Sequence, residues 1–510
     1  MKQTIHRSII MFSVVAQAML ATAENAVIID RIRNSSLPLY SVETAGYLTN
    51  PATSFFSDST SISSISMRAR LNDESQPIME QTGTGSRLFS INADSYQRLS
   101  ADMAVWGSAS YTTGVYKDIK WTNCIDYEYV APYVLGDEVG GDLNTQSYRF
   151  AGGIARRHDR WTFGAHLSYR AEIASRDHDP RVKTVVSFLN AAIGAAFNVT
   201  PRYMVGLNGK VSVYNQNCDV DFYNPINDIN IYTLTGMGTY YKRFMGNANK
   251  NSGYNSVGFS ASAQFLSTDK SGLKAAVSFD SYRMKQQLRN FNNLTLGFTD
   301  NTILTGSAAY RFTPSGSIIV EPVLTACARF RKGTENIFGT SAGASYDKIG
   351  SNSYYRHNSF LAEISVPVQW SINSNLCLTS MPGFSIFHDK ESYADPMRKT
   401  CVTRFTPGLR ENLSLTRGAW LWSIDASGAY RLSDSDDPVW TDLDLTSPLG
   451  KCQLHNYAML SADCIEATVD FSAARSIGKT AIKGTIFYSI NHYLRHGDNS
   501  LAGITLGIYF

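Results

Sequence analysis

The chain contains little charge and, beyond its first residues, no long apolar run. Asp, Glu, Lys and Arg make up 17% of the 510 residues, below the ~25% of an ordinary soluble domain. Aromatic residues reach 12%, and there are 37 glycines. A membrane-spanning helix requires ~20 consecutive apolar residues, and no stretch after the N-terminus meets that requirement. The composition therefore excludes a helical membrane protein and is unusual for a soluble one.

Metal-binding and anchoring motifs are also missing. The seven cysteines show no CxxC spacing, and the first of them is Cys124, which excludes a lipoprotein anchor near the N-terminus. Their number is odd, and the sequence leaves their pairing open. The 46 basic residues include Lys2 and Arg7, so a chain without its first residues carries 44 basic against 43 acidic side chains. We therefore expect no cofactor, no metal site and no nucleic-acid partner.

The N-terminus has the pattern of a secretory signal peptide. Lys2 and Arg7 supply the charged region, residues 9–21 are mostly apolar, and residues 21–23 read Ala-Thr-Ala. Small residues of this kind mark a cleavage site. The pattern predicts that residues 1–23 are removed and that the chain is exported.

The last ten residues alternate between two faces. Phe510, Ile508, Leu506 and Ile504 share the apolar face, as expected for a β-strand, in which successive side chains point in opposite directions. Residues 161–173, 202–214, 360–372 and the segment after Gly418 alternate in the same way. A chain that stops on such a strand resembles the C-terminal assembly signal of Gram-negative outer-membrane barrels, which implies the barrel-assembly machinery as a partner.

Short turns and longer connections follow one another along the chain. Residues 158–160 and 416–418 are short turns, whereas residues 217–251, 332–354 and 433–453 are long connections. Outer-membrane barrels place short turns on the periplasmic rim and long loops outside. Aromatic residues beside the short turns would form a girdle at the periplasmic interface; they are Trp161, Tyr203, Phe312, Trp370 and Trp420. We therefore predict an all-β, transmembrane, antiparallel up-and-down barrel surrounded by the lipid of the cell outer membrane.

The number of strands depends on one hairpin. Residues 59–71 and 87–93 alternate over shorter lengths than the other segments. We expect about 16 strands if these two are not part of the wall and 18 if they are, with 14 as a further alternative. The expected domains are the signal peptide 1–23, an N-terminal periplasmic or plug segment 24–83, and the barrel 84–510.

Two resemblances bear on this arrangement. Residues 47–52, which end in Asn50-Pro51-Ala52, resemble the start of fatty-acid transporter-like barrels, whose N-terminal segment plugs the lumen. That resemblance implies a plug, and a flexible periplasmic tail is the alternative. The motifs at 94–99, 106–114 and 137–142 are together similar to an uncharacterised outer-membrane β-barrel family of Bacteroidota, a domain of unknown function. This second resemblance implies the fold and the location but no chemistry.

The polar faces of the alternating strands carry charges of both signs, which are candidates for lining the lumen. They are His166, Arg170, Glu172, Lys210, Glu321, Arg329, Glu363, Asp425, Arg431, Glu466, Asp470 and Lys483. Their arrangement favours a channel or accessory transporter for a small polar solute, either alone or beside a larger uptake receptor. The alternative is a closed barrel whose charges pair inside and whose loops bind ligands.

An enzyme is the third hypothesis. His166 and Ser168 share a face but lie two residues apart on one strand, roughly 7 Å, too far for direct proton transfer. We therefore assign no catalytic residue and do not expect an enzyme.

Overall fold

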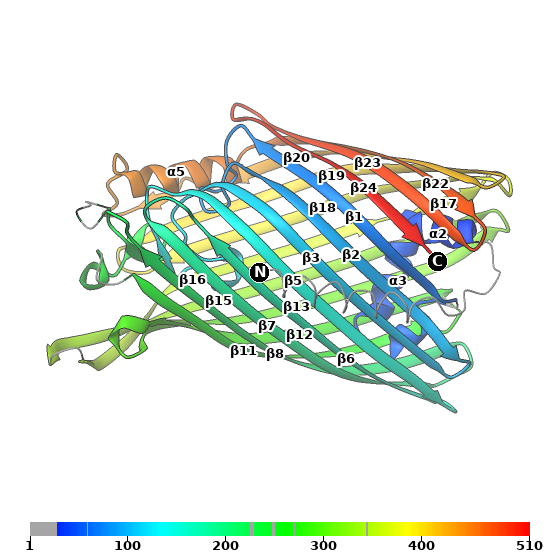
Figure 1. Ribbon diagram of the computed structural model, residues 1–510, viewed down its shortest axis with the longest axis horizontal. Helices are drawn as coiled ribbons and strands as arrows, with labels where there is room; N and C mark the ends of the chain where they lie inside the picture. Colours follow the sequence, from blue (N-terminus) through cyan, green and yellow to red (C-terminus); the bar gives the residue numbers. More distant parts are fainter. Residues whose placement is uncertain are drawn as a thin grey trace, which may run out of the picture.

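Each wall strand pairs antiparallel with its neighbours in chain order, and the last strand pairs with the first (Figure 1). The computed structural model describes residues 28–58, 60–224, 226, 229–246, 250–269, 271–342 and 345–510. The predicted signal peptide, residues 1–23, lies outside these ranges. Because the sheet closes on itself, no strand has a free edge with unpaired backbone N–H and C=O groups. This is the condition for a β-structure in a bilayer.

The wall is built from long strands. In chain order they are β1 (Ile62–Glu74), β2 (Gly85–Ser100), β3 (Met103–Ile119), β5 (Gly141–His158), β6 (Trp161–Ser175), β7 (Arg181–Asn198), β8 (Tyr203–Asp221), β11 (Asn251–Ser267), β12 (Gly272–Leu288), β13 (Leu294–Ser315), β14 (Ile318–Val320), β15 (Val323–Ala342), β16 (Ser345–Ser365), β17 (Val368–Ser371), β18 (Leu376–Tyr393), β19 (Arg398–Arg417), β20 (Trp420–Ser435), β21 (Val439–Trp440), β22 (Cys464–Ile477), β23 (Thr480–Tyr493) and β24 (Gly497–Tyr509). The short β14, β17 and β21 continue β15, β16 and β20, so the described wall has 18 strands.

The expectation of about 16 strands is therefore wrong. The two segments left out of that count, 59–71 and 87–93, form the hairpin of β1 and β2, which pair over twelve registered positions from Ile62 to Asp73. β1 also pairs with β24. The wall thus begins at Ile62, inside the range 24–83 expected for the N-terminal segment.

The C-terminal strand closes the barrel directly. The backbone N–H of Ser63 donates to the carbonyl of Phe510 at 2.8 Å, and the N–H of Phe510 donates to the carbonyl of Ser63 at 3.0 Å. Leu506 and Ile504 pair with Met67 and Ala69 of β1. The final residues therefore provide one half of the seam between the two ends of the sheet.

The two ends of the barrel carry different insertions (Figure 1). One end holds the first and last residues of the wall and its short turns. It also holds the helices α2 (Ile28–Ser36), α3 (Pro38–Leu48) and η1 (Thr53–Phe56). The long connections at the other end contain α4 (Tyr127–Val130), β4 (Val134–Gly136), β9 (Tyr232–Gly236), β10 (Thr239–Tyr240), η2 (Lys242–Phe244), η4 (Arg289–Phe291) and α5 (Pro448–Leu460). Helix α5 begins where the Ser447 hydroxyl accepts a hydrogen bond from the Gly450 N–H at 3.1 Å. No helix in the described ranges is long and apolar enough to cross a membrane.

Large apolar side chains cover the outside of the wall. Ile193, Val257 and Leu207 are 71%, 67% and 60% exposed. A water-soluble protein does not leave a continuous belt of such residues in contact with water. Lipid chains are the environment that matches this surface.

Candidate functional site

The N-terminal segment, defined here as residues 28–58, crosses the lumen at the short-turn end. Helix α2 contacts β20, β22 and β23, helix α3 contacts β11 and β12, and η1 contacts β5, β6 and β7. These strands belong to separate sectors of the wall. The segment therefore spans the opening from one side to the other.

Helix α2 docks through an apolar face. Ile28, Ile29 and Ile32 pack against Leu421 of β20 and Ala474 of β22. Leu421 is 1% exposed, whereas its neighbours on the outward face form part of the apolar belt. The helix therefore lies on the inner side of the wall.

The Asn50-Pro51-Ala52 turn packs directly against glycines of β6 and β7. A Cβ atom added to Gly164 of β6 would lie 2.3 Å from the backbone carbon of Pro51, and one added to Gly194 of β7 would lie 1.9 Å from Asn50 Oδ1. No side chain fits between the wall and this turn. Glycine is required here because the backbone of the turn approaches the sheet so closely.

Hydrogen bonds hold the same turn to β8 and β11. Asn50 Nδ2 donates to the Leu207 carbonyl at 3.3 Å, and Asn208 Nδ2 donates to the Thr49 carbonyl at 2.6 Å. Tyr47, which is fully buried, donates from its hydroxyl to the Ser267 carbonyl at 2.5 Å. Each such bond contributes about 1 kcal/mol net.

Phe55 of η1 anchors the far side of the segment. Its ring is buried, and the Arg98 guanidinium of β2 lies 4.0 Å from the ring centroid. Arg98 Nη2 also donates to the Asp58 carbonyl at 2.7 Å. The contact combines a cation–π interaction with a hydrogen bond to the chain that leads into β1.

Loops from the opposite end also fold into the lumen. The lid, defined here as residues 120–140, packs Trp121, Val130 and Val134 against the lumenal side chains Tyr214 of β8 and Tyr254 of β11. The Leu135 N–H donates to the Tyr254 hydroxyl at 2.9 Å. The lid therefore occupies the interior instead of projecting outward.

A buried ion pair fixes the lid to the wall. Arg176 Nη1 lies 3.1 Å from Asp137 Oδ2, and both side chains are completely buried. Asp137 also accepts from the Gly140 N–H at 2.7 Å. Removing one partner from such a pair leaves an uncompensated buried charge, at a cost of about 3–5 kcal/mol.

Polar cavities are lined by side chains of the wall strands and, in two cases, of the lid. One of about 370 Å³ is lined by Arg329, Arg331, His357, Glu391 and Arg404. A second of about 770 Å³ is lined by residues that include Arg68, Asp94, Arg149 and Arg170, and a third of about 470 Å³ by residues that include Glu363, Arg410 and Glu466. The lining carries both signs of charge.

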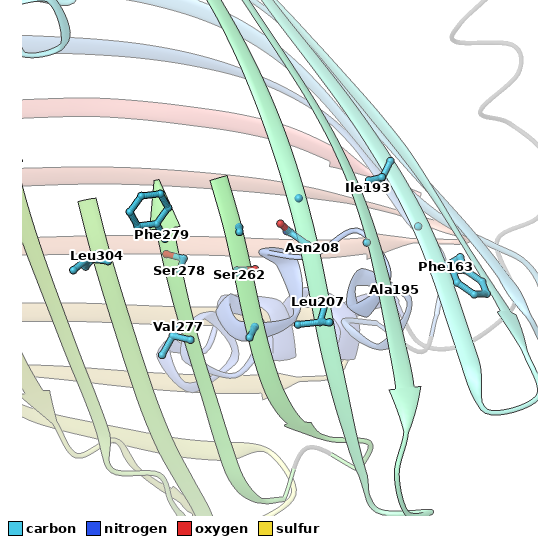
Figure 2. A pocket seen from close by; sticks show the side chains of 15 residues that line it. Phe163, Ile193, Ala195, Leu207, Asn208, Ser262, Val277, Ser278, Phe279 and Leu304 are labelled. Atoms are coloured by element: carbon cyan, nitrogen blue, oxygen red, sulfur yellow. The ribbon is translucent and has the colours of Figure 1, made fainter. Parts of the chain in front are cut away.

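A different hollow lies over β6 to β13 (Figure 2). Its volume is about 910 Å³, and Phe163, Ile193, Leu207 and Val277 flank small residues such as Ala195. These flanking side chains belong to the exposed apolar belt, and the N-terminal helices are seen behind the strands. The hollow is part of the lipid-facing surface.

Most predicted lumen residues contact a polar partner in the structure. The ion-paired ones are Arg170 with Asp126 and Glu172 (3.2 Å to the latter), Lys210 with Asp280 (3.2 Å), Glu321 with Lys274 and Arg311 (2.5 Å to the latter), Asp425 with Arg410 (2.8 Å), and Arg431 with Glu466. His166 Nδ1 accepts from Trp106 Nε1 at 3.2 Å, and Lys483 Nζ donates to Ser36 Oγ at 2.6 Å. Within the described ranges, no hydrogen bond or ion pair joins Arg329, Glu363 or Asp470 to another side chain.

His166 and Ser168 are engaged with different neighbours. Ser168 Oγ accepts from Asn190 Nδ2 at 3.4 Å, whereas His166 contacts Trp106. The structure does not join the two residues in a catalytic pair. In the described part of the chain, no group of three His, Cys, Asp or Glu side chains could hold a metal ion.

Several polar and charged residues of the lumen were not among the predicted ones. His357 Nε2 lies 2.7 Å from Asp389 Oδ1, and the Tyr355 hydroxyl donates to Glu391 Oε1 at 2.7 Å. Both pairs join β16 to β18. Extending the alternation of residues 360–372 backward would have placed His357 and Tyr355 on the polar face. Asp126 and Asp137 carry no such signal because they lie in the lid.

The predicted girdle residues all lie beside short turns. Trp161, Trp370, Phe312 and Trp420 are 47%, 47%, 42% and 38% exposed, and Tyr203 stacks on Phe265 at 5.0 Å between centroids. Their contact with an interface stays a prediction.

Residues 51–510 match the model of the Family of unknown function (DUF6850). The chain belongs to this family. The match names no group of organisms and no fatty-acid transporter, so both of those resemblances stay predictions. No curated protein matches the chain.

Among solved structures, the chain is similar to several barrels at low identity. A mutant of the ferric enterobactin receptor PfeA from Pseudomonas aeruginosa is 7% identical, with a TM-score of 0.38, over 88% of this chain and 80% of that one. The copper transporter OprC is 9% identical, with a TM-score of 0.39, over 87% and 81%. The CymD monoaromatic hydrocarbon channel is 9% identical, with a TM-score of 0.33, over 91% and 92%.

The closed barrel, the apolar outward belt and the division between short turns and long loops agree on one location. The protein is an integral outer-membrane β-barrel. Outer-membrane barrels place their short turns at the periplasmic rim, so we expect the short-turn end to face the periplasm and the long-loop end to face outward.

Proposed function

We propose that the protein is a gated channel for a small polar solute, acting alone or as an accessory of a larger uptake system. The N-terminal segment is its gate at the periplasmic end. The observation that carries this proposal is the path of residues 28–58, which contact three sectors of the wall across the lumen. A barrel of this size is wide enough to hold an aqueous lumen.

The gate is held by contacts that can be broken and remade. Its polar attachments are single hydrogen bonds such as those of Asn50 and Tyr47, at about 1 kcal/mol each. The apolar attachments are a few side chains of α2 and η1. The wall keeps its own hydrogen bonds when the segment leaves, so opening does not require the barrel to change.

The cavities support a polar solute as the cargo. Their linings contain arginines, carboxylates and hydroxyl groups, and Arg329 faces the cavity of about 370 Å³ without a carboxylate partner among the described side chains. Mixed charge gives weak ion selectivity. A path for a fatty acid would require a more apolar lining.

Liposome swelling tests the proposal. Vesicles that contain the mature protein or a variant lacking residues 28–58 are placed in solutions of small neutral sugars or amino acids. We expect slow swelling with the mature protein and fast swelling with the variant. Matched vesicles without protein provide the baseline.

A closed scaffold is the second candidate. The observation that favours it is the lid, because Arg176 and Asp137 fix it in the lumen from the outward end. In that case neither protein causes swelling, and the loops around β9 and α5 carry the function by binding a ligand. The barrel-assembly machinery and a larger uptake receptor stay predicted partners.

A further inference from the structure

Two thiols far apart in the sequence meet inside the barrel. Cys124 lies in the lid and Cys218 lies on β8, 94 positions later, yet their Sγ atoms are 3.6 Å apart. Cys124 is 5% exposed and Cys218 is fully buried. They are not bonded in the structure. In the described part of the chain, no other two cysteines are in contact.

The backbone on both sides of this contact is fixed. Thr184 of β7 is the registered neighbour of Cys218, and its Oγ1 donates to the carbonyl of Asn123 at 2.6 Å. The Asn123 N–H donates to the Leu135 carbonyl at 2.7 Å. The residue before Cys124 is therefore hydrogen-bonded to the strand beside Cys218, which keeps the two sulfur atoms opposite each other.

We propose that the mature protein in the outer membrane carries a disulfide bond between Cys124 and Cys218. The S–S bond is ~2.0 Å long, so the sulfur atoms must approach by roughly 1.5 Å, which small rotations about the two Cα–Cβ bonds provide. Exported proteins fold in a compartment where such bonds form and persist. The Sγ atoms of this pair are 3.6 Å apart before any adjustment.

The oxidant is a disulfide of an exported thiol oxidase. One thiolate of the pair attacks a sulfur of that disulfide, forms a mixed disulfide and releases the first oxidase thiolate. The second cysteine of the pair, as its thiolate, then displaces the other oxidase sulfur. The products are the Cys124–Cys218 bond and a reduced oxidase dithiol, which has gained the two electrons and two protons that the pair lost.

The bond would fasten the lid to the wall. It adds a covalent link to the lid, which Asp137 and Arg176 already attach through a buried ion pair. If the protein is a gated channel, as proposed above, the lid then stays in place and opening occurs at the N-terminal segment. The bond itself does not depend on that function.

Thiol counting on protein extracted from native outer membranes tests the bond. The protein is denatured with excess alkylating reagent, once without reductant and once after reduction. We expect five labelled cysteines in the first sample and seven in the second, since two of the seven are bonded. Trypsin without reductant should release residues 121–149 and 211–242 as one linked peptide. Seven labels before reduction, or a linked peptide that joins other cysteines, would overturn the proposal.

Variants give an independent count. Cys218→Ser should show six labelled cysteines both without reductant and after reduction. The control Cys452→Ser removes another buried cysteine and should show four labelled cysteines without reductant and six after reduction. An unchanged difference of two labels in Cys218→Ser would also contradict the bond. The measurement on the unaltered protein stands even if a variant fails to fold.

Discussion

The close contact between the Asn50-Pro51-Ala52 turn and Gly164 leads us to predict that Gly164→Ala displaces the turn. The added Cβ would lie 2.3 Å from the carbon and 2.4 Å from the oxygen of the Pro51 carbonyl group, and 2.5 Å from the Ala52 nitrogen. These are backbone atoms of a turn, so no side-chain rotation relieves the overlap. Gly164 has an ordinary strand conformation, which alanine adopts without strain. The barrel should therefore form normally while the turn lifts from the wall.

The size of the effect follows from the contacts that the turn loses. Lifting it breaks at least the hydrogen bonds from Asn50 to the Leu207 carbonyl and from Asn208 to the Thr49 carbonyl. At about 1 kcal/mol each, their loss is about 2 kcal/mol, which corresponds to a roughly 30-fold shift of a closed–open equilibrium. The open probability of single channels measures this shift.

Gly209→Ala is the matched control. Gly209 lies on β8 next to Asn208, and a Cβ added there meets no atom within 4 Å. It should behave as the unaltered protein does. Heat-modifiable migration on gels would show that both variants form closed barrels. Equal open probabilities for Gly164→Ala, Gly209→Ala and the unaltered protein would mean that the turn does not close the lumen.

Three further predictions concern other parts of the molecule. Arg329→Glu reverses a lumenal charge that has no carboxylate partner among the described residues, and the ratio of cation to anion permeability in the open channel should rise severalfold; an unchanged reversal potential would remove Arg329 from the pathway. The pKa of Asp179 is lowered because the backbone N–H groups of Asn224 and Tyr223 donate to its carboxylate. This stabilisation is present above the unfolded pKa and is lost as the pH falls through the lowered folded pKa, so the protection factors of these two amides against hydrogen exchange should fall in acid relative to neutral pH. Equal protection factors in acid and at neutral pH would contradict it. Deleting Phe510 removes both hydrogen bonds that end the barrel seam, and the yield of heat-modifiable protein should fall at least severalfold; a normal yield would mean that the seam forms without it.

The barrel was predictable because a bilayer imposes a period of two on every strand. Residues 161–173 and 360–372 lie in β6, β16 and β17 as the alternation indicated. The strand number was not predictable in the same way, because each strand of a barrel gives only a weak signal. β1 alternates clearly only from Ile65 to Leu71, and its place in the wall rests on its pairing with β24.

The interior was less predictable than the wall. Alternation places Arg170 and Arg431 on the polar face, but it does not tell which partner each one meets. Arg170 pairs with Asp126, 44 positions away, in a lid whose inward direction no periodicity encodes. The docking of Asn50 likewise depends on glycines of β6 and β7 that are more than a hundred positions away in the sequence. Contacts between a loop and a distant strand require the folded structure.

Single-channel recording in a planar bilayer shows directly whether the N-terminal segment closes the lumen. The refolded mature protein is compared with a variant that lacks residues 28–58 and keeps β1, which begins at Ile62, so that the wall is complete. We expect a mostly closed mature protein with brief openings, and stable conductance steps from the variant. The absence of steps from both proteins, when both migrate as closed barrels, would contradict a gated channel and favour the scaffold that displays its loops.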